Sequence, residues 1–282
     1  MTTRETIRFR RTRKTAMPDL FSNIGIWDII LIVVVSVKGT FAAYIPHPRW
    51  KAFILLSPIP FTFAVLALGQ PLDATNLSGL LVLLLYTFAV KFLYRQFKLP
   101  IVWAIILSAL GYCVIGGILA MVIPKTETAF LIAAVAVSTV AAILHSAMPH
   151  PLEPKQQSPL PIWKKTIAIA LVISFIVIIK SHLQGFMTVF PMVGVIVAYE
   201  ARLSLYTVCR HIPVAMLGLV PMMTTCYVLQ EHIGLVPALL AGWVVYLIIL
   251  PLFVVPLWKK YDTEEDIRRI SCENQSETLG RN

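Results

Sequence analysis

Charged side chains are scarce in this sequence, and their scarcity excludes an ordinary water-soluble globular domain. Only 13% of the 282 residues are charged, whereas 58% are hydrophobic and the mean hydropathy is +0.80. A soluble domain of this size carries about 25% charged residues, and without them its surface would expose large apolar patches. Because lipid tolerates such a surface, the composition predicts an integral membrane protein.

The sequence also lacks the motifs of the common metal, cofactor and nucleophile sites. It contains no CxxC pair, no Walker loop, and no GxSxG or GxGxxG fingerprint. Three of the four cysteines lie in apolar segments, where a buried cysteine behaves as a small hydrophobic residue. We therefore expect no catalytic residue, no metal and no cofactor.

Acidic residues are rarer than basic ones, 14 against 24, so the net charge is +10. The basic residues lie mainly in short loops and at the two ends of the chain, where they set membrane topology and contact anionic lipid headgroups. This placement argues against nucleic acid as a partner and favours the lipid bilayer. The sequence is also compatible with a homodimer.

Long hydrophobic runs make up most of the chain. Nine segments are long enough, or nearly so, to cross about 30 Å of hydrocarbon as helices. They are Ile26–Ile45, Ala52–Gly69, Leu77–Tyr94, Leu99–Ile123, Thr128–Met148, Thr166–Gly185, Phe186–Ala201, Ile212–Gln230 and Leu235–Phe253. The predicted fold is all-α, a polytopic transmembrane helix bundle of about nine spans. A basic N-terminal tail (1–24) precedes it, and a polar tail (259–282) follows it.

The charges of the connectors predict the orientation of the bundle. Cations gather in alternate connectors, which contain Arg49, Lys51, Arg95, Lys98, Lys155, Lys164, Lys165, Arg202 and Arg210. The positive-inside rule places this set and the C-terminus in the cytoplasm, as in a bacterial inner (plasma) membrane. The basic N-terminal tail contradicts that orientation. The conflict disappears if one early segment re-enters instead of spanning, so both topologies stay open.

Two parts of the chain, 25–124 and 166–258, share a plan. Each opens with an apolar helix that carries a late lysine, Lys38 in SVKGTF and Lys180 in IIKSHL, and each continues with a proline-interrupted segment. Region 125–165 supplies a linking helix and a proline-rich loop, so the second half enters the membrane from the opposite side. The sequence therefore predicts an inverted repeat of four helices, a plan found in many secondary transporters.

The late lysine of the first helix and the interruption Pro58-Ile59-Pro60 carry a family resemblance. In this pattern each half resembles the GlpM-like family of small four-helix bacterial membrane proteins. The resemblance covers one half of the chain at a time. It implies an architecture and does not imply a substrate.

Lys38 and Lys180 are the strongest candidates for a binding site. At 1.5 Å per residue they lie roughly 18 and 21 Å into the membrane from opposite faces. A lysine at such depth costs about 2.5 kcal/mol or more, and usually faces the protein interior or a wet cavity. Two such ammonium groups would bind an anion. The alternative is that each lysine extends to the nearer interface.

The prolines Pro58, Pro60 and Pro191 predict broken helices. A proline removes one amide hydrogen and frees a carbonyl, and a half-helix N-terminus near the midplane suits a carboxylate or phosphate. Three hydroxyl residues flank the breaks and could donate hydrogen bonds to the substrate, namely Ser57, Thr62 and Thr188. The alternative is a simple kink supported by neighbouring helices.

Glu200 and His182 are candidates for coupling, because each could carry a proton near these segments. An interfacial carboxylate and a structural histidine are the alternatives. Together these features predict a secondary transporter for a small anionic solute. A membrane-embedded enzyme acting on a lipid or polyprenyl phosphate, and an anion channel or assembly subunit, are the other function classes.

Overall fold

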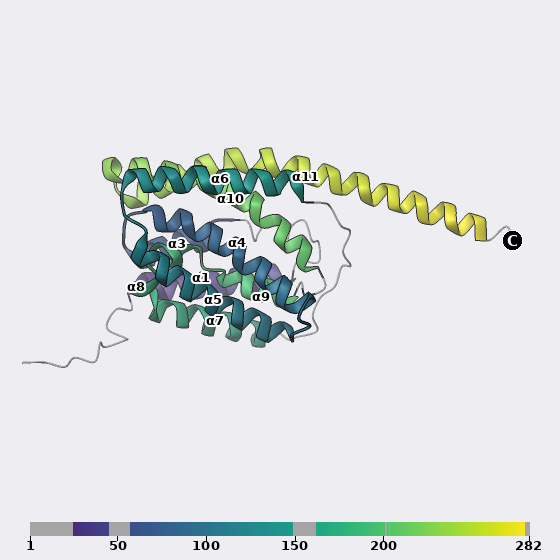
Figure 1. The fold of residues 1–282 in the computed structure, drawn as a ribbon, viewed down its shortest axis with the longest axis horizontal. Coiled ribbons are helices and arrows are strands. Elements are labelled where there is room, and N and C mark those ends of the chain that lie inside the picture. Colours follow the sequence, from purple (N-terminus) through teal and green to yellow (C-terminus); the bar gives the residue numbers. More distant parts are fainter. Residues whose placement is uncertain (1–24, 45–56, 149–161, 201, 203, 280–282) are drawn as a thin grey trace, which may run out of the picture.

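The computed structural model describes residues 25–44, 57–148, 162–200, 202 and 204–279. These residues form helices and no strands, so the all-α prediction is confirmed for this part of the chain (Figure 1). The helices are α1 (Ile26–Tyr44), α3 (Ile59–Leu68), α4 (Ala74–Arg95), α5 (Ile101–Val122), α6 (Glu127–Ala147), α7 (Ile162–Ile178), α8 (Lys180–Leu183), the 3-10 helix η1 (Gln184–Val189), α9 (Met192–Glu200), α10 (Leu205–Ile233) and α11 (Leu235–Leu279). The basic N-terminal tail lies outside the described residues.

Five helices are long and apolar enough to cross a membrane: α4, α5, α6, α10 and the part of α11 from Leu235 to Pro256. They make the fold compatible with an integral membrane protein. Three of the nine predicted segments are not continuous helices in the described residues. The sixth is interrupted at Ile179, between α7 and α8. The second is represented by α3, which has only ten residues, and the seventh is divided between η1 and α9. Proline explains the differences in the second and seventh segments, because it cannot donate the hydrogen bond that would continue a helix.

Local sequence signals account for where the helices begin and end. Asp73 caps α4 by accepting a hydrogen bond from the Thr75 amide at 2.8 Å, and the Asn76 side chain accepts one from the Asp73 amide at 2.8 Å. This reciprocal capping satisfies amides that the first turn leaves free. At the other kind of terminus, α3 ends at Gly69 with a φ of 65°, which glycine adopts without steric cost.

Side chains tie α4 and α10 together in an antiparallel arrangement. The Gln230 side chain, in α10, accepts from the Leu72 amide at 2.8 Å and donates to the Leu72 carbonyl at 3.0 Å. At the opposite end, Lys91 of α4 lies 4.2 Å from the ring centroid of Tyr206 in α10. We call these the Asp73 end, with Leu72, Asp73 and Gln230, and the Ser204 end, with Lys91, Ser204 and Tyr206.

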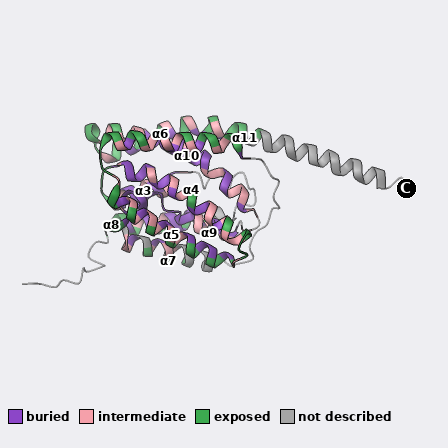
Figure 2. Ribbon diagram, in the orientation of Figure 1, coloured by how far each residue is buried: buried purple, intermediate pink, exposed green. Residues whose placement is uncertain are grey.

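The helices pack around two hydrophobic clusters. One lies among α1, α4, α5, α7, η1 and α9, and the other lies among α3, α4, α6, α10 and α11. Buried residues face these clusters, and exposed residues lie on the outer helices (Figure 2). Many exposed side chains are large and apolar, including Trp103, Leu107, Leu110, Val114 and Ile118 on α5, Leu131 and Val135 on α6, and Leu240, Val244 and Leu247 on α11. An apolar outer surface of this kind suits contact with lipid.

The irregular segment η1 is held inside the bundle. The Tyr112 hydroxyl donates to the Phe186 carbonyl at 2.8 Å, and the Gly185 amide donates to the Thr75 hydroxyl at 3.1 Å. The Asn76 amide group also donates to the Thr188 hydroxyl at 3.0 Å. Irregular backbone is tolerated at membrane depth only where protein or water satisfies it, and these bonds meet that requirement.

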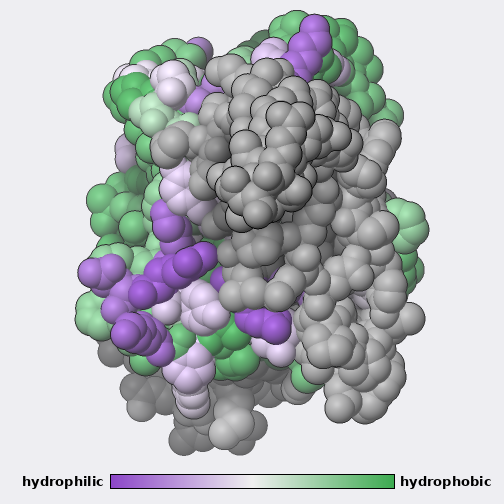
Figure 3. Space-filling model, turned by 90° about the vertical axis from the view of Figure 1, so that its right-hand side faces the viewer, coloured by the Kyte–Doolittle hydropathy of each residue, from purple (hydrophilic) through white to green (hydrophobic). Residues whose placement is uncertain are grey.

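The last helix extends well beyond the bundle. α11 continues through Pro251 and Pro256 to Leu279, and it projects from the Ser204 end of the molecule (Figure 1). Viewed from the side on which α11 leaves, the hydrophilic side chains of the described residues gather mainly at the lower left, whereas hydrophobic side chains lie along the edges (Figure 3). The predicted polar tail (259–282) is thus helical as far as Leu279.

Candidate functional site

The two proline interruptions meet at one cavity of about 220 Å³. Ser57, Pro58 and Pro60 line it at the start of α3, and Pro191 lines it at the start of α9. The breaks are far apart in the sequence, but the fold brings their helix starts to the same place. The residues Ser57, Pro58, Pro60 and Pro191 that the sequence singled out are therefore neighbours of one cavity.

The rest of the wall comes from α4 and α10. The α4 residues that line it extend from Leu83, near the middle of that helix, to Val90, and the α10 residues extend from Leu205 to Leu219. Since Leu205 opens α10, the cavity runs from the middle of the bundle toward the Ser204 end.

The first turn of α9 presents amide groups with no backbone acceptor. Met192 donates to the Phe190 carbonyl at 2.7 Å, and Val195 donates to the Pro191 carbonyl at 2.9 Å. The amides of Val193 and Gly194, which lie between these donors, make no such bond within the described residues. Free first-turn amides carry the positive end of the helix dipole, so this turn favours a negative group.

The first turn of α3 also contains an amide group with no backbone acceptor. Thr62 donates its amide to the Pro58 carbonyl at 2.9 Å, and the Phe61 amide has no backbone acceptor among the described residues. Pro60, the residue before Phe61, has no amide hydrogen at all. Phe61 is buried and lines the cavity. Two half-helix N-termini thus reach the same cavity.

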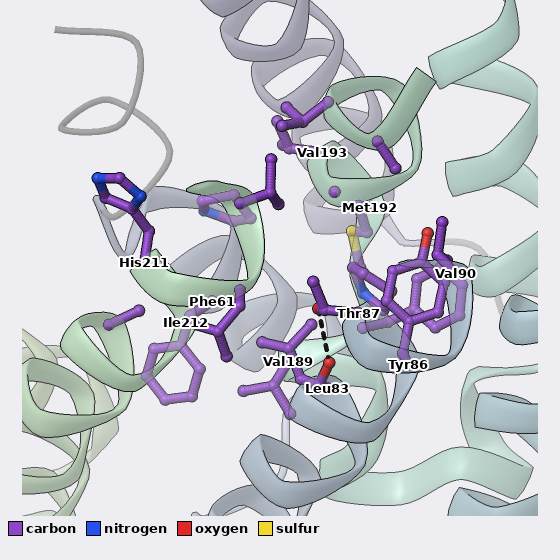
Figure 4. A pocket seen from close by; sticks show the side chains of 18 of the residues that line it. Phe61, Leu83, Tyr86, Thr87, Val90, Val189, Met192, Val193, His211 and Ile212 are labelled. Carbon is purple, nitrogen blue, oxygen red and sulfur yellow. Dashed lines mark hydrogen bonds between the residues drawn. The ribbon is translucent and has the colours of Figure 1, made fainter. Parts of the chain in front are cut away.

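Tyr86 adds a buried hydroxyl to this wall. The residue is 3% exposed, and its hydroxyl oxygen has no hydrogen-bond partner in the described structure. The neighbouring Thr87 hydroxyl, by contrast, donates to the Leu83 carbonyl at 2.9 Å (Figure 4). A buried polar group left unpaired costs about 1–3 kcal/mol, so the unpaired Tyr86 hydroxyl is a candidate contact for a ligand.

Lys38 lies behind the cavity wall. Its side chain is 7% exposed, and its Nζ donates to the Ser57 carbonyl at 2.7 Å. Lys38 is not among the residues that line the cavity. Its amino group therefore supports the chain just before α3, close to the start of that helix.

The other predicted residues lie outside the cavity lining. The Thr62 hydroxyl donates to the Pro58 carbonyl at 3.0 Å and accepts from Trp243 Nε1 at 2.9 Å, which ties α3 to α11. The Thr188 hydroxyl donates to the Gly185 carbonyl at 2.6 Å, on the Asp73 side of the cavity. Glu200 is buried at the end of α9, and His182 is exposed on α8. The side chain of Lys180 lies outside the described residues.

Sequence reasoning missed several residues of this region. Tyr86, Thr87 and His211 all line the cavity. Tyr86 and Thr87 lie in an apolar run with no spacing that marks them, and His211 lies in the predicted connector just before Ile212. Arg210 corrects one expectation, because it is not a loop residue. It is buried in α10, which begins at Leu205, seven residues before the predicted start at Ile212.

The fold and this cavity define a class: an all-helical bundle with membrane-compatible helices and two half-helices that start at one internal cavity. No protein-family model, no curated protein and no solved structure matches this chain. The resemblance to the GlpM-like family therefore stays a prediction about architecture. The geometry of the cavity is therefore what indicates a function.

Proposed function

We propose that the protein is a secondary transporter that moves a small anionic substrate, carboxylate or phosphate-like, across the membrane by alternating access. The observation that carries the proposal is the meeting of two half-helix N-termini, those of α3 and α9, at one cavity near the middle of the bundle. Such paired helix starts offer backbone donors and partial positive charge to an anion.

The directions of the half-helices support an inverted repeat. α3 runs from the cavity to the Asp73 end, because Gly69 leads directly to the start of α4. α9 runs from the cavity to the Ser204 end, because Glu200 leads to the start of α10. In the repeat, α1, α3, α4 and α5 correspond to α7, α9, α10 and α11, and α6 is the linking helix. Adding α1, α7 and the two broken segments to the five apolar helices gives about nine crossings.

The charge distribution supports a cytoplasmic Ser204 end. Arg95 ends α4 there, and Lys98 and Arg202 lie in the connectors at the same end. At the Asp73 end, Lys125 forms an ion pair with Asp73 at 3.4 Å, which leaves little excess of positive charge. With the positive-inside rule, the cavity faces the cytoplasm and the structure corresponds to an inward-facing state.

Packing on the other side of the cavity fits that state. Phe186 and Met187 of η1 are fully buried, and the residues on either side of them, Gly185 and Thr188, are bonded to the start of α4. In an alternating-access cycle, this packed region would open as the Ser204 end closes.

Transport in proteoliposomes tests the proposal. A panel of carboxylates and phosphates is first screened for thermal stabilisation of the purified protein, because a ligand that binds only the folded state raises Tm. Uptake of the stabilising anion is then measured with an imposed ion gradient. We expect Lys38→Met and Lys180→Met each to abolish uptake while protein yield is kept.

Lys125→Met is the matched control, since Lys125 is 51% exposed and lies at the Asp73 end, away from the cavity. It should leave uptake within about twofold of the wild type, as expected for an exposed ion pair. Unchanged uptake in both Lys38→Met and Lys180→Met would contradict the proposed mechanism. A conductance in planar bilayers far above carrier turnover would contradict alternating access and favour a channel.

A further inference from the structure

The polar groups of the cavity converge where α4 faces the first turn of α9. The ring of Tyr86 lies beside Gly194, since a Cβ added to Gly194 would lie 3.9 Å from Tyr86 Cε1. The unpaired Tyr86 hydroxyl therefore neighbours the turn that holds the free amides of Val193 and Gly194 (Figure 4). Because the tyrosine hydroxyl can donate as well, this corner offers several donors to one acceptor group.

The lining indicates that the acceptor is negatively charged. None of the described residues that line the cavity is Asp or Glu. The start of α3 lies in the same wall, and the Lys38 amino group is 2.7 Å from the carbonyl of Ser57, a lining residue. Donors and helix N-termini both favour an anion, and hydrogen bonds to a charged acceptor are the stronger kind.

The remaining wall is mainly apolar, although Ser57, Thr87, Ser204, Thr207 and His211 also line it. Phe61, Val90, Val189, Met192 and Ile212 are typical of it (Figure 4). An inorganic anion such as phosphate would lose water on all sides but regain hydrogen bonds mainly at the corner formed by Tyr86 and the first turn of α9. An anion with an apolar body loses little by contact with such a wall, and it gains from burial of its hydrocarbon part.

The volume limits the size of that body. A protein cavity of about 150 Å³ is enough to bind benzene, and this cavity has about 220 Å³. The additional space suits one carboxylate group. A body of about six to eight carbons therefore fits, whereas a much longer chain does not.

We propose that this cavity binds monocarboxylates with a compact apolar body of benzoate size. The carboxylate lies at the first turn of α9 and accepts a hydrogen bond from the Tyr86 hydroxyl. The apolar wall surrounds the hydrocarbon body of the substrate. This inference rests on the proposed function, since it names the substrate class of the same cavity. It also identifies Tyr86 as a binding residue.

Isothermal titration calorimetry on the purified full chain tests the inference with three probes: benzoate, inorganic phosphate and the uncharged benzyl alcohol. We expect benzoate to bind at least about tenfold more tightly than the other two. Tyr86→Phe removes one oxygen and keeps the ring, so it should weaken benzoate binding about tenfold, the effect of one lost hydrogen bond to a charged group. Its effect on benzyl alcohol should be much smaller.

Tyr94→Phe is the control, because Tyr94 lies on the same helix but does not line the cavity, and it should bind benzoate as the wild type does. Equal benzoate affinity in wild type and Tyr86→Phe would overturn the assignment of Tyr86. Tighter binding of phosphate than of benzoate, with Lys38-dependent phosphate uptake, would overturn the apolar substrate class and leave the transporter standing. Tyr86-dependent benzoate binding without uptake of any anion would support this inference and contradict the transport function.

Discussion

At the scale of single residues, two buried tyrosines differ in one respect that matters. Tyr112 is 2% exposed and donates to the Phe186 carbonyl at 2.8 Å, whereas Tyr86 is equally buried but its hydroxyl is unpaired in the described structure. Removing an unpaired buried donor relieves a desolvation penalty, whereas removing a paired one leaves a buried carbonyl without its partner.

The two tyrosines should therefore respond oppositely to the same substitution. Without ligand, Tyr86→Phe should raise the free energy of unfolding by about 1 kcal/mol, and Tyr112→Phe should lower it by about 1–3 kcal/mol. Chemical denaturation of the two variants in the same detergent measures both changes. Destabilisation by Tyr86→Phe would mean that the hydroxyl has a structural partner, which would weaken its assignment to a ligand.

The sequence allowed some of these residues to be predicted. Proline inside an apolar run is visible as such, so Pro58, Pro60 and Pro191 could be assigned to helix breaks before their common location was known. Lys38 could be predicted to lie in the interior because it occurs deep within an apolar segment, where a lysine usually faces protein or a wet cavity. Tyr86 could not be found, because an unpaired hydroxyl is a property of its surroundings and not of its place in the chain.

At the scale of elements, the position of η1 depends on a close backbone approach. A Cβ at Gly185 would lie 2.1 Å from Thr75 Oγ1 and 2.7 Å from the backbone nitrogen of Asn76. The backbone atom belongs to the capped first turn of α4 and cannot move aside without breaking the cap. Only glycine allows η1 to lie against α4 in this way.

Gly185→Ala should accordingly destabilise the protein by about 3 kcal/mol, at the upper end of the usual effect of overpacking. Gly117→Ala on α5 is the control, since a Cβ there meets nothing within 4 Å, and alanine should stabilise that helix by up to about 1 kcal/mol. Thermal unfolding of both variants compares them. A Tm for Gly185→Ala equal to that of the wild type would show that η1 can shift away from α4.

Element boundaries were predicted less well than element types. The sequence places the start of the eighth segment at Ile212, but the corresponding helix α10 starts at Leu205 because Arg210 is accommodated inside the bundle. The seventh predicted segment begins at Phe186, but the half-helix α9 begins only at Met192. In both cases packing within the bundle decides the boundary. It buries Arg210, which the sequence alone assigns to a loop, and it holds the residues before Met192 as η1, which the sequence alone assigns to a helix.

At the scale of the whole molecule, the sequence and the fold both bear on the orientation of the bundle in the membrane. The connector that contains Arg95 and Lys98 lies at the Ser204 end, and α11 leaves the bundle at that end. We expect a green fluorescent protein fused at the C-terminus to fluoresce in bacterial cells and an alkaline phosphatase fused there to be inactive.

The same reporters inserted after Lys125, at the Asp73 end, should give the reverse pattern. Reversed results at both sites would place the cavity on the external side and would contradict the inward-facing assignment. That successive connectors lie at opposite ends of the bundle could be predicted from the number of apolar runs. The common cavity of α3 and α9 could not be predicted, because it depends on packing between segments that are distant in the sequence.

The donors at the start of α9 belong to the main chain. Mutation can replace every side chain of that turn and still leave the amides of residues 193 and 194 in place, provided that the proline keeps its position. Anion binding of this kind can therefore persist through extensive sequence divergence. Substitutions in the apolar wall would meanwhile change which apolar substrate body fits the cavity. Relatives of this protein should be sought by the spacing of lysine and proline within apolar runs, since residue identity around the cavity is free to change.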